Sequence, residues 1–231
     1  MPNIVKNTTF PNPLDLLAPH SCRGCGHIGK VLCDRCKNNI ILGHNNYCPN
    51  CHIIITANKC NRCKSLPLTF VAGNRSELIY QLAYDFKYNS IRSLAEPLAE
   101  ILNEILPIID EPVDVVPLPT IDRHIRERGL DHTYLIAKYL CKLRNWQVNR
   151  VLSRAKNNVQ VGSNRQTRLT QATSNYILAS KKKINPSITY ILLDDIWTTG
   201  ASMKSAIKKL QQAGVQKIIV AILATSHVNQ N

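Results

Sequence analysis

Acidic side chains are scarce in the second half of this chain. The last hundred residues, 132–231, contain two of them, Asp194 and Asp195, against fifteen lysines and arginines. Apolar runs are also short, and none approaches the roughly 20 residues that span a bilayer. Residues 1–20 hold one lysine, several prolines and no continuous apolar core, so they do not resemble a secretion signal. We therefore expect a cytoplasmic protein without membrane insertion.

Basic side chains dominate instead. The formal net charge is +14 over 231 residues. If eight of the nine cysteines bind two Zn²⁺ ions as thiolates, the working charge is about +10. A basic chain favours polyanionic partners, either nucleic acid or small phosphorylated compounds, although a general gain in solubility would leave the same pattern.

The cysteines are concentrated in one segment. A Cys-x2-Cys hairpin presents two sulfur atoms to one ion, and a tetrahedral Zn²⁺ takes two hairpins. Seven residues separate the first Cys-x2-Cys pair from the second, and eight separate the third pair from the fourth. Eleven residues lie between the second pair and the third. This spacing favours a tandem repeat of two structural zinc sites over interleaved pairing or disulfides. The eight ligands are Cys22, Cys25, Cys33, Cys36, Cys48, Cys51, Cys60 and Cys63.

Beyond the cysteines, continuous apolar strands alternate with amphipathic helices. That alternation indicates an α/β fold, with a parallel sheet flanked by helices. We expect a lead-in over 1–20, a double zinc ribbon over 21–66 and the α/β domain over 67–231. The predicted strands are 68–72, 114–118, 190–193 and 218–223. The predicted helices are one capped by Ser76, one around Pro97, one over 132–145, and one over 202–213 ended by Gly214.

The acid pair stands at the end of an apolar strand and is followed by a turn. Adjacent carboxylates at that place can accept hydrogen bonds from vicinal ribose hydroxyls. Thr198, Thr199 and Ser202 supply hydroxyl donors, and Gly200 allows close backbone approach. The helix that follows directs free N–H groups at a phosphate. The pattern predicts a sugar-phosphate site.

The segment from Asp194 to Ser202 resembles the signature of the type I phosphoribosyltransferases. The order of motifs along the chain is similar to the ComF family: a cysteine-rich segment, Val116-Pro117-Leu118, Arg123-x2-Arg126-x-Arg128-Gly129, and then the Asp-Asp element. The resemblance covers nearly the whole chain. It implies a type I phosphoribosyltransferase-like parallel sheet behind a small double zinc ribbon, with 5-phosphoribosyl-1-pyrophosphate (PRPP) and Mg²⁺ as ligands. It also implies a link to natural competence and DNA uptake.

The resemblance assigns further roles. Pro117, Leu118 and the arginines Arg123, Arg126 and Arg128 fall where the family holds pyrophosphate. Residues 153–175 resemble a hood that closes over PRPP, and within it Gln160 and Arg168 match the family spacing before the aromatic Tyr176. Asp194, Asp195 and Arg168 are the expected catalytic residues.

One stretch departs from the family. Where the family continues Arg-Gly-Phe-Asn-Gln, this chain has Arg128-Gly129-Leu130-Asp131-His132. The contacts that the Asn and Gln side chains make in the family must therefore be made differently in this chain, which has Asp131 and His132 at those positions.

Two functions follow from these motifs. The first is phosphoribosyl transfer from PRPP to an acceptor of nucleobase type, with release of pyrophosphate. The second is a non-catalytic, PRPP-responsive protein of the DNA-uptake machinery, with single-stranded DNA and an uptake helicase as partners. The basic charge and the altered Asp131-His132 pair favour the second, while the Asp-Asp-x2-Thr-Thr-Gly element fits both.

Overall fold

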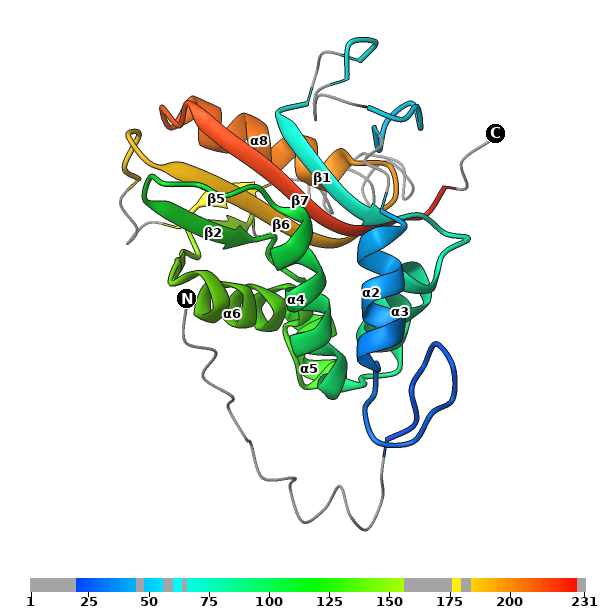
Figure 1. The fold of residues 1–231 in the computed structure, drawn as a ribbon. Helices are drawn as coiled ribbons and strands as arrows, with labels where there is room; N and C mark the ends of the chain where they lie inside the picture. Colours follow the sequence, from blue (N-terminus) through cyan, green and yellow to red (C-terminus); the bar gives the residue numbers. More distant parts are fainter. Residues whose placement is uncertain are drawn as a thin grey trace, which may run out of the picture.

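The computed structural model describes residues 20–44, 48–55, 60–63, 66–155, 176–179 and 184–227. Its centre is a five-stranded sheet in the order β1-β7-β6-β2-β3, and every strand pair in it is parallel (Figure 1). The strands are β1 (Leu68–Gly73), β2 (Val113–Pro117), β3 (Gln147–Val148), β6 (Thr189–Trp197) and β7 (Lys217–Thr225).

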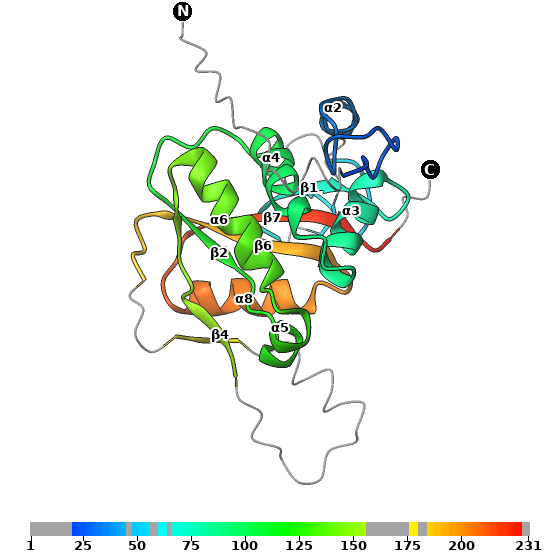
Figure 2. The same cartoon turned by 90° about the horizontal axis from the view of Figure 1, so that it is seen from below.

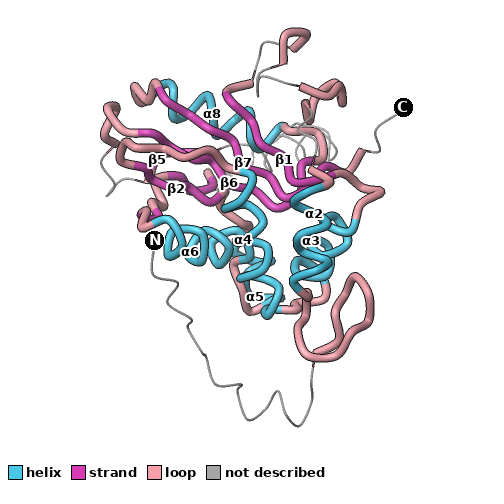
Figure 3. Tube along the Cα trace, in the orientation of Figure 1, coloured by secondary structure: helices cyan, strands magenta, loops and turns pink. Residues whose placement is uncertain are grey.

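Helices cover both faces of this sheet. One face carries α3 (Leu78–Tyr88), α4 (Ala95–Ile105) and α6 (His132–Arg144), and the opposite face carries α8 (Ala201–Gln212), as Figure 2 shows. A short 3-10 helix, η1 (Arg92–Leu94), precedes α4, and α5 (Asp122–Arg128) follows the end of β2. Strands β4 (Leu152–Arg154) and β5 (Tyr176–Leu178) form a separate antiparallel pair. Strand β4 is labelled in Figure 2 and β5 in Figure 3.

The core is divided by the sheet into two apolar clusters, one on each face. Ile191 and Leu193 of β6 belong to the cluster under α3, α4 and α6, while Tyr190 and Leu192 of the same strand belong to the cluster under α8. Successive side chains of a strand point to opposite faces, so a strand buried on both sides must be apolar at every position. The unbroken apolar runs in the sequence have this cause, and the predicted fold class is confirmed.

Several local expectations were wrong. The sequence pattern placed the end of β6 at Leu193, but the strand continues to Trp197, so the acid pair lies within it. Ser76 is not the cap of α3, because the helix begins at Leu78 and its N-cap is Glu77. Ser76 instead donates through its backbone N–H and its hydroxyl to Asn74 Oδ1, at 2.9 and 2.6 Å. Pro97 sits in the first turn of α4, where a missing N–H costs little.

The first group of cysteines packs directly on the α/β domain. Helix α2 (Asp34–Leu42) follows Cys33 and lies against α4 and β1. Cys22 and Cys36 belong to the same apolar cluster as α3 and α4, whereas Cys48 and Cys60 form a small cluster of their own with Ile55. Among the described helices, none has the length and apolarity needed to cross a membrane.

Candidate sugar-phosphate site and zinc sites

A cleft of about 380 Å³ opens at the carboxyl ends of β2 and β6. Parallel α/β sheets bind ligands at this edge, where the loops after neighbouring strands meet. The turn after β2 forms one side of the cleft, and the turn after β6 forms the other. The remaining walls are lined by Lys87, Tyr88, His124, Arg128, Arg154 and Tyr176.

The turn after β2 is fastened by hydrogen bonds on several sides. Leu118 N–H donates to the carbonyl of Leu193 at 2.9 Å, which continues the β2–β6 pairing by one residue. The Thr133 hydroxyl donates to the Leu118 carbonyl at 3.0 Å, and Arg154 Nε donates to the Pro119 carbonyl at 2.9 Å. Leu118, Pro119, Thr120 and Ile121 line the cleft, whereas Pro117 is the last residue of β2 and lies behind them.

The acid pair lies in the floor of the cleft. Successive residues of a strand point to opposite faces, so the two carboxylates have different surroundings. Asp195 is buried, with 3% of its surface exposed, and Asp194 is half-buried. Asp195 N–H donates to Asp194 Oδ1 at 2.9 Å, and Ile196 N–H donates to Asp195 Oδ1 at 2.6 Å. These backbone contacts orient both carboxyl groups before any ligand binds.

Lys87 neutralises one of the two carboxylates. Its Nζ lies 2.7 Å from Asp195 Oδ1, and it reaches the cleft from the last turn of α3. Burial lowers the pKa of Lys87, but the charges of Asp195 and Asp194 outweigh burial and leave it raised. No described cation forms an ion pair with Asp194, so burial, followed by the charge of Asp195, outweighs the more distant charge of Lys87 and raises the pKa of Asp194 to about 7. The pair therefore combines an ion-paired carboxylate with one that ionises near neutral pH.

The turn after β6 has the geometry expected of a phosphate site. Thr198, Thr199, Gly200, Ala201 and Ser202 line the cleft, and Gly200 caps α8 with a φ of 72°. Its neighbour across the turn is the Trp197 ring, which a Cβ on residue 200 would meet at 2.0 Å. The first N–H groups of a helix have no partner within the helix and carry partial positive charge. Those of α8 start at this turn.

Only one of the three predicted arginines lines the cleft. They lie on the seven-residue helix α5, where residues four apart share a face. His124 and Arg128 line the cleft, while Arg123 faces outward and pairs with Glu127 at 2.6 Å. Arg126 is exposed as well. Arg128 also stacks over the ring of Tyr88, with 5.1 Å between the guanidinium carbon and the ring centroid.

The residues that depart from the ComF pattern have separate places. Asp131 is the N-cap of α6, and its Oδ1 accepts from Tyr134 N–H at 3.4 Å and from the Thr120 hydroxyl at 3.2 Å. It thereby ties the turn after β2 to the start of α6. His132 lies in the wall of the cleft.

The predicted hood lies mostly outside the described residues. Gln160 and Arg168 belong to this part, so the structure gives no position for them. The two strands that flank it are described: Arg154 at the end of β4 and Tyr176 at the start of β5 both line the cleft. Tyr176 is buried, which raises the pKa of its hydroxyl, and Arg154 lies 5.2 Å from its ring centroid.

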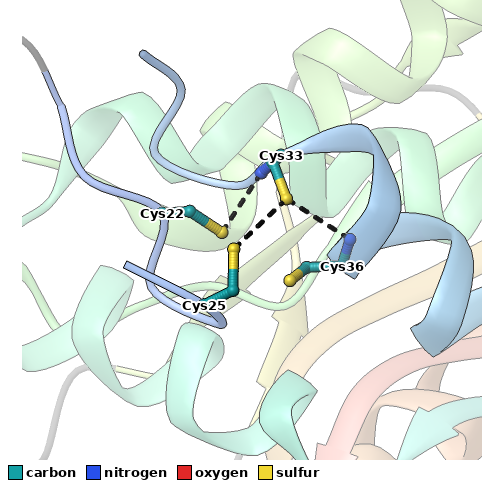
Figure 4. Close-up of side chains that lie close together, drawn as sticks. All are labelled: Cys22, Cys25, Cys33 and Cys36. Carbon is teal, nitrogen blue, oxygen red and sulfur yellow. Dashed lines mark hydrogen bonds between the residues drawn. The ribbon is translucent and has the colours of Figure 1, made fainter. Parts of the chain in front are cut away.

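Four sulfur atoms meet in the first cysteine group. Cys22, Cys25, Cys33 and Cys36 have sulfur atoms that all lie within 4.8 Å of one another (Figure 4). The Sγ atoms of Cys25 and Cys33 are 3.7 Å apart. Zinc–sulfur bonds of about 2.3 Å give a tetrahedron edge of about 3.8 Å, whereas a disulfide needs about 2.05 Å. The group therefore fits a tetrahedral zinc ion.

The second group has the same design. The sulfur atoms of Cys48, Cys51, Cys60 and Cys63 also lie within 4.8 Å of one another, with 3.5 Å between those of Cys51 and Cys60. The tandem pairing is confirmed, and the interleaved and disulfide alternatives are wrong. Four thiolates around a zinc ion would leave no coordination position open, so each group has the ligand set of a structural site.

Sequence reasoning missed Lys87 and His124, and it placed Arg154 only within the hood segment 153–175. Each stands on an element whose position at the cleft depends on long-range packing. Lys87 is separated from Asp195 by 108 positions along the chain. The only local signal is a lysine directly after Phe86, at the end of the apolar stripe of α3.

No protein-family model matches the sequence. Over 223 residues the chain is 27% identical to competence protein F of Haemophilus influenzae, and the match covers 88% of this chain and 94% of that protein. The ComF resemblance is confirmed.

A solved structure shows a weak similarity. It is a hypoxanthine phosphoribosyltransferase from Staphylococcus aureus, with a TM-score of 0.34 and 14% identity over 59% of this chain and 73% of the other. This similarity is too weak to say anything about the ligand of the ComF-like chain.

Proposed function

We propose that the ComF-like chain binds PRPP in the cleft at the ends of β2 and β6 and transfers its 5-phosphoribosyl group to an acceptor. The observation that carries this proposal is the meeting of three parts in one cleft: the acid pair, the Thr-Thr-Gly turn at the start of α8, and the turn after β2 with Arg128. PRPP has a diol between two phosphate-bearing ends. The three parts match it in chemistry and in order.

Each part has a role in the proposal. Asp194 and Asp195 hold the ribose hydroxyls. The 5-phosphate binds at Thr198, Thr199, Gly200 and Ser202, where hydroxyls and free N–H groups of α8 converge. Pyrophosphate lies along the turn after β2, with Arg128 as its cation. Mg²⁺ would accompany PRPP, whose oxygen atoms are the hard ligands that this ion prefers, and would offset the negative charge of the pyrophosphate.

Transfer then requires one bond change at C1 of the ribose. The C1–O bond to pyrophosphate breaks, a nitrogen of the acceptor bonds to C1, and the proton on that nitrogen passes to the departing pyrophosphate. Developing positive charge on the sugar is stabilised by the nearby carboxylates, and negative charge on the leaving group by Arg128. We assign Arg168 to closure over this site from the hood, as the family resemblance implies. Arg123 and Arg126 are left with no direct role, since they face away from the cleft in this structure.

The biological setting is also proposed. Competence protein F gives the precedent in its name, and a net charge of +14 suits work beside DNA. We place the chain in the cytoplasm, in the DNA-uptake machinery. The second candidate is a PRPP-responsive binding protein without turnover, with single-stranded DNA and an uptake helicase as partners. The same charge favours it.

Pyrophosphate release separates the two candidates. We expect release from PRPP and Mg²⁺ with at least one base in a panel of purines and pyrimidines. If the protein binds PRPP but releases pyrophosphate with none of the bases, the result contradicts the transferase and favours the binding protein. Affinity of the binding protein for single-stranded DNA should fall steeply with salt, and a lack of binding even at low salt would contradict that second candidate.

Two arginines of the same helix give a matched pair of variants. Arg128→Met should weaken PRPP binding about tenfold or more, because one charge-assisted contact is lost. Arg126→Met should change it less than twofold, since Arg126 is exposed and does not line the cleft. Titration calorimetry measures both. Equal losses would show that the arginines act through general charge and not through the cleft.

A further inference from the structure

His132 is a buried polar residue that the proposed roles leave unused. It is the first residue of α6, lines the cleft and has 1% of its surface exposed. Neither Nδ1 nor Nε2 has a hydrogen-bond partner among the described residues. Its ring meets Phe86 edge-on, with 4.8 Å between ring centroids.

Such a side chain is costly to keep. A buried donor or acceptor without a partner destabilises a fold, because its hydrogen bonds to water are lost and not replaced. Buried polar atoms in proteins are otherwise nearly always paired, so an unpaired imidazole in a cleft wall points to a partner that arrives with the ligand. If the ring served packing on Phe86 alone, an apolar side chain of similar shape would do this without the cost.

The surroundings of His132 determine its chemical form. Burial lowers its pKa. Among the charged groups around it, Asp195 on β6 opposes this, Arg128 on α5 and Lys87 on α3 add to it, and Asp131 at the cap of α6 opposes it. The balance keeps the pKa lowered, so the ring is neutral at pH 7. A neutral imidazole offers one N–H donor and one lone pair.

We propose that His132 is a ligand-binding residue that donates its N–H to a ribose hydroxyl, the proton of which is accepted by Asp195. A hydroxyl group both donates and accepts hydrogen bonds, whereas a carboxylate only accepts them. Asp195 can therefore accept the hydrogen bond that the ribose hydroxyl donates. The N–H of His132 supplies the hydrogen bond that the same hydroxyl accepts. Lys87 fixes Asp195 by their 2.7 Å contact and so orients this arrangement. The inference rests on the proposed function, because it takes the ribose of PRPP as the ligand.

Two substitutions test this contact. His132→Phe keeps a ring against Phe86 and removes both nitrogen atoms, whereas His132→Gln keeps a donor and an acceptor. The phenylalanine variant should unfold at a higher temperature than the wild type without ligand, because two unpaired polar atoms are removed. It should also bind PRPP with Mg²⁺ about tenfold more weakly. The glutamine variant should stay within about threefold of the wild-type affinity.

Calorimetric titration with PRPP and thermal unfolding without ligand give the two readouts. If the wild type binds PRPP and the phenylalanine variant binds it equally well, the His132 contact is wrong while the proposed function stands. Lower thermal stability of the phenylalanine variant would show a partner inside the fold and would also overturn the inference. If the wild type binds no PRPP, the proposed function fails, and the His132 contact fails with it.

Discussion

Asp194 and Asp195 are neighbours in the sequence, yet they have different surroundings. Lys87 contacts Asp195 directly, whereas Asp194 is half-buried without a cation at hydrogen-bond distance among the described residues. A carboxyl group with a pKa near 7 is poised between forms at physiological pH, and perturbed groups of this kind gather at functional sites. The electrostatic cost of placing the two carboxyl groups together therefore shows in the raised pKa of Asp194.

Substituting Asp194 should reveal that cost. Since its pKa is raised from 3.8 to about 7 on folding, the native state binds more protons than the unfolded state between these values. Stability contributed by this residue therefore falls as the pH rises from about 4 to about 7. Asp194→Asn should be more stable than the wild type by on the order of 1–3 kcal/mol at pH 8, and close to it at pH 4. Urea unfolding at both pH values measures the difference. A constant difference across pH would contradict the raised pKa.

At the scale of elements, the Thr-Thr-Gly turn depends on a close approach. Gly200 joins β6 to α8 in a left-handed backbone conformation, and the Trp197 ring fills the space that its side chain would take. Trp197 is held in turn, because its carbonyl accepts from Ser226 N–H at 2.8 Å after the end of β7. The turn after β6 is therefore fixed by two neighbouring strands.

Gly26 and Gly200 allow the cost of a left-handed backbone to be distinguished from the cost of steric overlap. Gly26 has a φ of 75°, close to the 72° of Gly200, but a Cβ there meets nothing within 4 Å. Gly26→Ala should cost about 1 kcal/mol of stability, from backbone strain alone. Gly200→Ala should cost at least about 2 kcal/mol and also weaken PRPP binding, because Trp197 must move. Chemical unfolding of the zinc-loaded protein measures both costs. Equal costs would show that the indole does not restrict the turn.

Sequence reasoning found some elements of this site and missed others, for a physical reason. Strands β1, β2, β6 and β7 were predictable because burial on two faces demands apolar runs, and most helices were predictable as well. Helix α5 was not predicted because its residues are largely polar, and the β4–β5 pair was not predicted because each strand has only three residues. The acid pair and its turn are contiguous in sequence and could be read from it. Lys87 and Arg154 reach the cleft only through tertiary packing.

At the scale of the whole molecule, the two zinc sites are joined to the fold differently. The first contributes Cys22 and Cys36 to the main core, and Arg23 beside Cys22 pairs with buried Asp85 of α3 at 3.8 Å. In α2, Lys37 pairs with Glu100 of α4 at 2.6 Å. The described part of the second site has its own small cluster. We expect the first site to stabilise the α/β domain and the second to fold more independently.

Zinc removal tests that difference. The purified protein should contain two zinc ions per chain, since each cysteine group offers four ligands. Cys36→Ser and Cys60→Ser should each lose one ion. Cys36→Ser should lower the free energy of unfolding in the main transition by several kcal/mol, because metal binding and folding of a shared core are coupled. Cys60→Ser should leave that transition nearly unchanged. Atomic emission and calorimetry measure these quantities. One ion or none in the wild type would refute the ribbon assignment.

Binding of PRPP by the acid pair is the central claim of this account. Titration calorimetry of the wild type and of the double variant Asp194→Asn, Asp195→Asn, with PRPP and Mg²⁺, tests it most directly. The wild type should bind with one site per chain, and the double variant should lose at least about a hundredfold in affinity, since two charge-assisted contacts to the ribose are removed. The same affinity in both proteins, or no binding by the wild type, would contradict the account.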